Sequence, residues 1–350
     1  MGFIRIFLAL SVVVWHLWGQ ALPFTVNGYD SVLLFFIISG FYMSMVLNGK
    51  YLNSSIAKFY AARLLRIYPL YLIILIAAVG FWDAIGKPLL PVPSTTRELL
   101  FVTFINITTF GIPSVSDWNF VANGPAWTLG LELQFYLVAP FILTRKPWVC
   151  VLVLLGLIAW RLSLRDRGFD WLYTSAQANA CFFMLGAVGH RIGTLIVDAP
   201  KRNILGWAAV AMLPIAGFFC GLPVVKHMDR PELWFFYLTF AAAMPFIFSI
   251  SMSSRFDRFL GDLCFPIYIV HVPLIVVLTH FGGTIFRYLP SEFSRQIELM
   301  IIVLAATALH LIVERPIEKI RQRLSAPAKP IRRAPLAGGY EAAPAGAPAE

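Results

Sequence analysis

The feature that most constrains this chain is a series of apolar runs, each about 17–20 residues long, that recur along most of the sequence. A bilayer has a hydrocarbon core about 30 Å thick, and a helix rises about 1.5 Å per residue, so one span needs about 20 such residues. The sequence therefore predicts an all-helical membrane protein whose chain crosses the bilayer many times.

Composition and charge support the same class. Charged residues make up only 13% of the chain and hydrophobic residues 59%, whereas a soluble domain carries about 25% charged residues. This excludes a cytosolic enzyme, a nucleic-acid-binding module and a disordered chain. The net charge of +10 comes from Lys and Arg in short loops between apolar runs, where basic residues set topology and meet lipid headgroups. We therefore expect membrane lipids, and no nucleic acid, as partners.

Ten runs are predicted to form a transmembrane bundle. They lie near residues 3–19, 31–47, 67–82, 127–144, 148–162, 176–190, 203–221, 233–252, 261–281 and 297–314. An eleventh run, residues 99–112, is short and contains polar Thr and Asn side chains. If it does not cross, 18 Lys and Arg residues lie inside and nine outside, in agreement with the positive-inside rule. We expect a re-entrant or surface helix there, ten spans, and both termini in the cytoplasm.

The chain divides into two predicted regions. Residues 1–322 form the transmembrane domain, and residues 323–350, rich in Ala, Pro and Gly, are expected to be a disordered cytoplasmic tail. The four cysteines do not have the spacing of a zinc site or of a disulfide framework. We interpret Cys150, Cys181, Cys220 and Cys264 as packing residues and expect no metal.

Ionisable residues inside apolar spans are candidates for function, because a charge at bilayer depth costs roughly 2.5–3.5 kcal/mol on insertion scales. Arg5 and His16 are eleven residues apart in the first span, which places both on one helix face about 16 Å apart, with Arg5 nearer the cytoplasm. The alternative is a snorkelling Arg5 and a hydrogen-bonded core His16.

Several strings resemble the membrane-bound acyltransferase 3 family, whose members acylate sugars. Arg5 through His16 fits its Arg-x10-His signature, and Ser39-Gly40-Phe41 and the arginine-rich FYAARLLRIYPLY string from Phe59 also match. Further matches are AWTLGLELQFYLVAP from Ala126, LGDLCFPIYIVHVPL from Leu260 and VERPIE from Val313. The similarity runs in the family's order over nearly the whole apolar part of the chain.

The resemblance implies acyl transfer from acyl-CoA, with acetyl-CoA as the donor, to a glycan or lipid-linked sugar. Arg63 and Arg66 lie three residues apart at the cytoplasmic edge and would bind the phosphates of the donor. Their alternative role is ordinary positive-inside anchoring. His16 would act either as the general base or as the carrier of a covalent acyl group, and Arg5 would steer or polarise the thioester.

Other polar residues receive secondary predictions. Glu132 is a third catalytic candidate, with Tyr136 one turn along the same face, although it could be a structural carboxylate. Ser39 could supply a hydroxyl or a close helix contact. His271 is the strongest candidate on its span, which also carries Asp262 and Tyr268. Trp127 lies near the predicted outer interface, where an aromatic belt residue is expected, and it could also stack on a sugar. Glu314 is read as structural, and His190, His227, His280 and His310 as peripheral.

The resulting hypothesis is a multi-pass O-acyltransferase of a bacterial inner membrane, acting on a cell-surface or exported polysaccharide. The rival is a secondary transporter in which His16, Glu132 and Arg5 form a proton or anion path. The sequence shows no inverted repeat of the kind that many transporters have.

Overall fold

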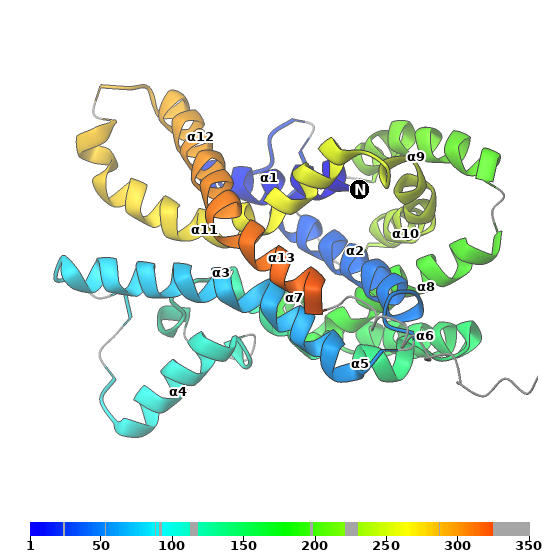
Figure 1. The fold of residues 1–350 in the computed structure, drawn as a ribbon. Helices are drawn as coiled ribbons and strands as arrows, with labels where there is room; N and C mark the ends of the chain where they lie inside the picture. The colour runs from blue at the N-terminus through cyan, green and yellow to red at the C-terminus, as the bar shows by residue number, and fades with distance from the viewer. Residues whose placement is uncertain are drawn as a thin grey trace, which may run out of the picture.

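The computed structural model describes residues 1–23, 25–52, 54–87, 89–90, 93–112, 118–196, 199–220, 230–286 and 288–324. Within these ranges the regular structure is helical and no strand occurs. The all-helical prediction is therefore confirmed (Figure 1). Most of the predicted tail, residues 325–350, lies outside the described residues.

Thirteen α-helices are assigned within the described residues. They are α1 (Gly2–Trp18), α2 (Gly28–Asn48), α3 (Ile56–Ala84), α4 (Thr96–Thr108), α5 (Ala126–Leu143), α6 (Pro147–Ser163), α7 (Phe169–Thr174), α8 (Ala176–Ile196), α9 (Ala199–Phe219), α10 (Pro231–Ser251), α11 (Arg255–Ile285), α12 (Ser291–Leu309) and α13 (Arg315–Leu324). A π-helical segment, η4 (His310–Glu314), joins α12 to α13.

Each predicted span coincides with a helix, but the helices differ in length. Within the described part of the chain, six segments are long and apolar enough to cross a membrane: α2, α3, α5, α10, most of α11, and the continuous stretch Ser291–Arg323. Shorter apolar helices cover Gly2–Trp18, Pro147–Ser163 and Asn203–Phe219. Length and composition thus establish a membrane protein with six candidate spans, and the number ten stays a prediction.

The run at residues 99–112 forms α4, a helix of 13 residues. At 1.5 Å per residue it is about 20 Å long, less than the thickness of the hydrocarbon core. The Asn106 side chain donates to the carbonyls of Val102 (2.9 Å) and Phe120 (2.7 Å) and accepts from the Ala122 amide (2.8 Å). These bonds fix α4 to the segment that leads into α5, while Phe104 on the other face is exposed.

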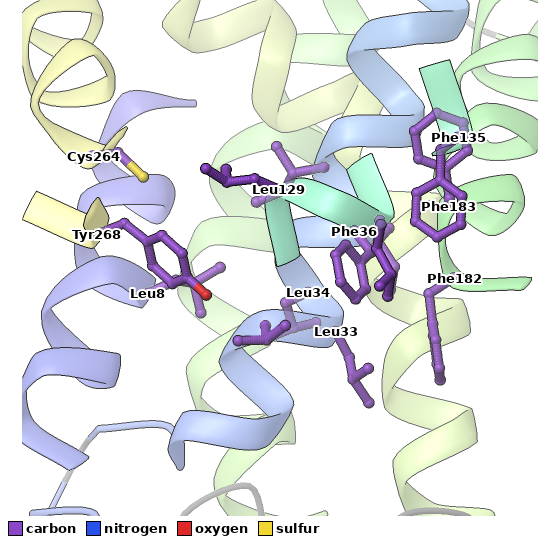
Figure 2. Close-up of a cluster of buried hydrophobic side chains, with 14 of the residues drawn as sticks. Leu8, Leu33, Leu34, Phe36, Leu129, Phe135, Phe182, Phe183, Cys264 and Tyr268 are labelled. Atoms are coloured by element: carbon purple, nitrogen blue, oxygen red, sulfur yellow. The ribbon is translucent and has the colours of Figure 1, made fainter. Parts of the chain in front are cut away.

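The core lies where α1, α2, α5, α8 and α11 meet. Figure 2 shows buried side chains from all five helices in one cluster, among them Leu8, Phe36, Leu129, Phe183 and Tyr268. A Cβ atom added to Gly40 of α2 would overlap the carbonyl oxygen of Phe183, and one added to Gly186 of α8 would overlap that of Ile37. The backbones of α2 and α8 therefore touch, as small residues permit in membrane bundles.

Helices α1 and α11 pack side by side in the same direction. At their first turns the Asp257 carboxylate accepts the backbone N–H groups of Gly2 (2.7 Å) and Phe3 (2.9 Å), which caps α1. Near the end of α1, the His16 ring lies 4.9 Å from the His271 ring, centroid to centroid. The parallel packing brings these two histidines to one level of the bundle.

Candidate functional site

His16 borders a large cavity at one end of the bundle. The cavity has a volume of about 940 Å³ and is walled by α1, α2, α5, α7, α8 and α11. Its lining is rich in aromatic side chains, and we call it the aromatic cavity: Trp15, His16, Tyr29, Trp127, Tyr173 and Tyr268. The centroids of the Trp127 and Tyr173 rings lie 4.7 Å apart. Aromatic walls with polar tips suit a ligand that has both apolar faces and hydroxyl groups.

The hydrogen bonding of His16 leaves one ring nitrogen available. Its Nδ1 lies 2.9 Å from the carbonyl oxygen of Val12, one turn earlier in α1. A carbonyl only accepts, so in the neutral ring Nδ1 carries the hydrogen and Nε2 keeps its lone pair. The side chain is exposed and lines the aromatic cavity. His16 can therefore take a proton or an acyl group from a molecule there.

His271 packs behind His16 and is fully buried. Its Nδ1 lies 2.7 Å from the carbonyl oxygen of Tyr268, which again assigns the hydrogen to Nδ1. Its Nε2 is buried and has no hydrogen-bond partner among the described residues. The edge-to-face contact of the two rings fixes the orientation of His16.

A line of polar side chains runs along α5, away from the aromatic cavity. Thr128, Glu132 and Tyr136 follow at four-residue spacing and share one helix face. The hydroxyls of Thr128 and Tyr268 are 3.1 Å apart, and Tyr136 donates to Glu132 Oε2 at 2.9 Å. At the far end, Ser39 Oγ lies 3.4 Å from the Tyr136 hydroxyl. We call these three α5 side chains the α5 polar face.

The α5 polar face leads toward a second, strongly basic region. Two cavities of about 580 and 400 Å³ share a wall that includes Arg5, Arg66, Arg258 and Arg321. We call the two together the basic cleft. Arg66 lies close enough to Tyr136 and Glu132 to interact with both electrostatically. The α5 polar face therefore lies between the two regions: Thr128 is hydrogen-bonded to Tyr268 of the aromatic cavity, and Glu132 and Tyr136 interact electrostatically with Arg66 of the basic cleft.

The three predicted basic site residues meet in the basic cleft. The guanidinium carbon of Arg5 lies 5.9 Å from the centre of the Tyr42 ring. Arg63 is 7% exposed, lines the smaller cavity and lies 5.8 Å from the Phe59 ring centre. Basic residues outnumber acidic ones by six to three in the lining of the smaller cavity, so the arginines there suit an anion.

A family comparison identifies the chain. A family model described as an acyltransferase domain matches residues 1–315, which is nearly all of the described chain. The chain belongs to the acyltransferase 3 family. The resemblance found in the sequence is confirmed, and so is the expectation of an acyltransferase at the level of the family.

Three relatives illustrate the range of the acyltransferase 3 family. The chain is 24% identical over 354 residues to the O-acetyltransferase OatA of Staphylococcus aureus, covering 90% of this chain and 56% of the relative. It is 31% identical over 292 residues to the ORF330 protein of Acidianus two-tailed virus, covering 77% of this chain and 81% of that relative. It is 26% identical over 241 residues to Nodulation protein 10 of Rhizobium leguminosarum bv. viciae, covering 59% of this chain and 63% of that relative. The chain thus spans about half the length of OatA, and no solved structure matches it.

The structure divides the predicted site residues of this acyltransferase 3 protein between two separate regions. His16 lines the aromatic cavity with His271 packed against it, and Arg5, Arg63 and Arg66 meet in the basic cleft. Arg5 and His16 therefore face different cavities of the bundle. Ser39, a candidate hydroxyl in the sequence, contacts Tyr136 and lines neither region.

Sequence patterns alone overlook or underrate three groups. Thr128 is missed, although its spacing from Glu132 is a usable signal. Arg258 and Arg321 count in the sequence only as topology signals, yet both line the basic cleft. Glu314 is expected to pair locally, and it does pair with His310 at 3.0 Å, but it also lines the larger cavity of the cleft.

Three further histidines, His190, His280 and His310, do not line the aromatic cavity. His190 Nδ1 is 3.0 Å from Ser44 Oγ, and His280 Nε2 is 3.2 Å from Lys87 Nζ; His227 lies outside the described residues. Across the part of the chain that the structure describes, no three His, Cys, Asp or Glu side chains gather as they would around a metal ion.

Proposed function

We propose that this protein is a ten-span O-acyltransferase of a bacterial inner membrane, which moves an acyl group, preferably acetyl, from acyl-CoA to a hydroxyl of a cell-surface or exported glycan. The transmembrane domain covers residues 1–322, and both termini are cytoplasmic. The observation that carries the proposal is the pairing of an anion site with a histidine cavity across the α5 polar face.

The donor would enter from the cytoplasm at the basic cleft. The cleft lies where α1 and α11 begin, since Arg5 and Arg258 line it, and basic residues favour the cytoplasmic side. Arg63 and Arg66 bind phosphate groups of coenzyme A through bidentate, charge-assisted hydrogen bonds. The pantetheine arm then extends along the α5 polar face toward His16. No metal is needed for this reaction.

The acceptor would occupy the aromatic cavity, where Trp127 and Tyr173 offer ring faces to a sugar. In the direct route, His16 Nε2 takes the proton of the acceptor hydroxyl while the hydroxyl oxygen attacks the thioester carbonyl. The C–S bond breaks, and the thiolate of coenzyme A receives the proton from His16. In the covalent route, Nε2 first attacks the thioester carbonyl, the C–S bond breaks and the coenzyme A thiolate leaves. The acceptor oxygen then attacks the acyl group on Nε2, the bond from the acyl carbon to Nε2 breaks, and the hydroxyl proton passes to the thiolate.

The relatives support the acyl group and the type of acceptor atom. OatA is named an O-acetyltransferase, and an oxygen acceptor with an acetyl donor fits a neutral imidazole acting as base or acyl carrier. Purified protein in nanodiscs, supplied with radiolabelled acetyl-CoA and a glycan acceptor, should release coenzyme A and label the glycan. A transporter would leave the thioester intact, and that result would contradict the proposal. In the covalent route, protein that is rapidly denatured at neutral pH should retain the label on His16.

Glu132→Gln is expected to lower turnover by about 10–100-fold in folded protein. The substitution removes the negative charge that faces Arg66 while keeping an oxygen that can accept from Tyr136; a hydrogen bond to a charged group contributes about 1.5–3 kcal/mol. Initial rates at saturating acetyl-CoA measure the effect. Tyr136→Phe is the control, because it removes the hydrogen bond and keeps the carboxylate. If the initial rate of Glu132→Gln equals that of the wild type, the charge of Glu132 has no role in turnover.

A further inference from the structure

Helix α13 forms part of the wall of the basic cleft. It follows the π-helical segment η4 and packs against α3, as the orange and blue ribbons of Figure 1 show. Glu318, Arg321 and Gln322 line both cavities, and Arg315 and Lys319 line the larger one. The sequence pattern assigns this segment only to the end of the last span and its cytoplasmic anchoring.

Arg321 points into the cleft toward the other arginines. Its side chain is 21% exposed and forms an ion pair with Glu318 on the same helix. Arg63 and Arg66 lie close enough to Arg321 to repel its charge. A guanidinium held among like charges is stabilised by an anion that they share. The position of Arg321 is therefore that of a ligand-binding residue more than that of a surface anchor.

The charge of the cleft supports the same conclusion. Seven basic and three acidic residues line the larger cavity, and six basic and three acidic residues line the smaller one. Both cavities therefore carry excess positive charge, and Arg321 stands at the wall between them. Coenzyme A presents two phosphate centres, a pyrophosphate and a 3′-phosphate, which suits two basic cavities that share one wall.

We infer that α13 is part of the donor site and that Arg321 binds a phosphate group of acyl-CoA. This inference rests on the proposed function, because it assigns a further residue to the donor of that reaction. Arg321 lines the smaller cavity together with Arg5, Arg63 and Arg66. Its Glu318 partner orients the guanidinium and leaves part of its N–H fork for the phosphate oxygens.

The test compares Arg321→Gln with Arg323→Gln. Arg323 is on the same helix, two residues further on, but it is exposed and lines neither cavity. Titration of coenzyme A into purified protein should give at least about a tenfold higher Kd for Arg321→Gln and a change within about twofold for Arg323→Gln. With acetyl-CoA, KM should rise by a similar factor while kcat stays within about twofold, because Arg321 is remote from His16.

A second variant keeps the test valid if Arg321→Gln folds poorly. Arg321→Lys retains the charge and should recover part of the affinity. Titration with 3′-dephospho-coenzyme A then assigns the phosphate: if wild type and Arg321→Gln bind it equally, Arg321 binds the 3′-phosphate, and if the tenfold difference persists, it binds the pyrophosphate. Either result supports the inference.

Two results would overturn it. If wild type binds coenzyme A and Arg321→Gln binds it within twofold of wild type, the inference fails and the proposed function stands. If wild type binds no coenzyme A and cleaves no acetyl-CoA, the proposed function fails and the inference fails with it.

Discussion

Replacement of His16 by Ala is expected to lower acyl transfer by about 10²–10⁴-fold, the range that general acid–base catalysis contributes. His16 lines the aromatic cavity with Nε2 free, because its Nδ1 is bonded to Val12. Alanine removes the group that takes the hydroxyl proton in the direct route and the group that carries the acyl chain in the covalent route. Release of coenzyme A and label on the glycan measure the loss.

The matched control for this variant is His280→Ala. His280 contacts Lys87 and Trp82 and lines neither the aromatic cavity nor the basic cleft, so its replacement should leave turnover within about twofold. Wild-type Kd values for coenzyme A in both variants would show that the donor site is intact. Full activity of folded His16→Ala would remove His16 from the mechanism.

Replacement of Gly40 by Val is expected to prevent folding of the bundle. Any Cβ at this position overlaps the carbonyl oxygen of Phe183, which is backbone and cannot rotate away. Helices α2 and α8 would have to separate in the middle of the core that Figure 2 shows. The cost should exceed the roughly 1–3 kcal/mol of ordinary overpacking. Size-exclusion chromatography in mild detergent should show aggregate in place of the folded monodisperse peak.

Gly80→Val separates this effect from helix propensity. Gly80 is in the interior of α3, and a Cβ there would meet no atom within 4 Å, so both variants change helix propensity alike and only Gly40→Val changes the packing. We expect Gly80→Val to elute and melt like wild type. A wild-type elution profile for Gly40→Val would mean that α2 and α8 do not pack as described.

The positions of the helices and the candidate site residues are predictable from the sequence, because the membrane restricts both the backbone and the side chains. Apolar runs of membrane length have no stable alternative to a helix, because each backbone polar group must be paired inside the segment. Charged and histidine side chains are rare at such depth, so His16 and Glu132 are conspicuous within their apolar runs. Their matches to a family pattern then supply the chemistry, which hydropathy alone does not encode.

The tertiary structure decided which of these residues meet. Arg5 and His16 lie on one helix face, yet they line different cavities, because eleven residues separate them by about 16 Å along α1. Helix α11 runs parallel to α1 and places His271 beside His16 and Arg258 in the same cavity as Arg5. The contribution of α13 is also invisible in the sequence, since its Arg321 resembles any basic residue after a last span. Such groupings depend on contacts between distant segments, which local pattern does not carry.

The sequence by itself therefore determined the class of protein, the helical segments and the residue types available for acyl transfer. The close approach of α2 and α8 at Gly40 and Gly186, the exposure of His16 to a cavity and the joining of two regions by the α5 polar face depended on packing. The physical reason is that membrane helices form by local hydrogen bonding, whereas their partners are selected by shape and by polar contacts between side chains.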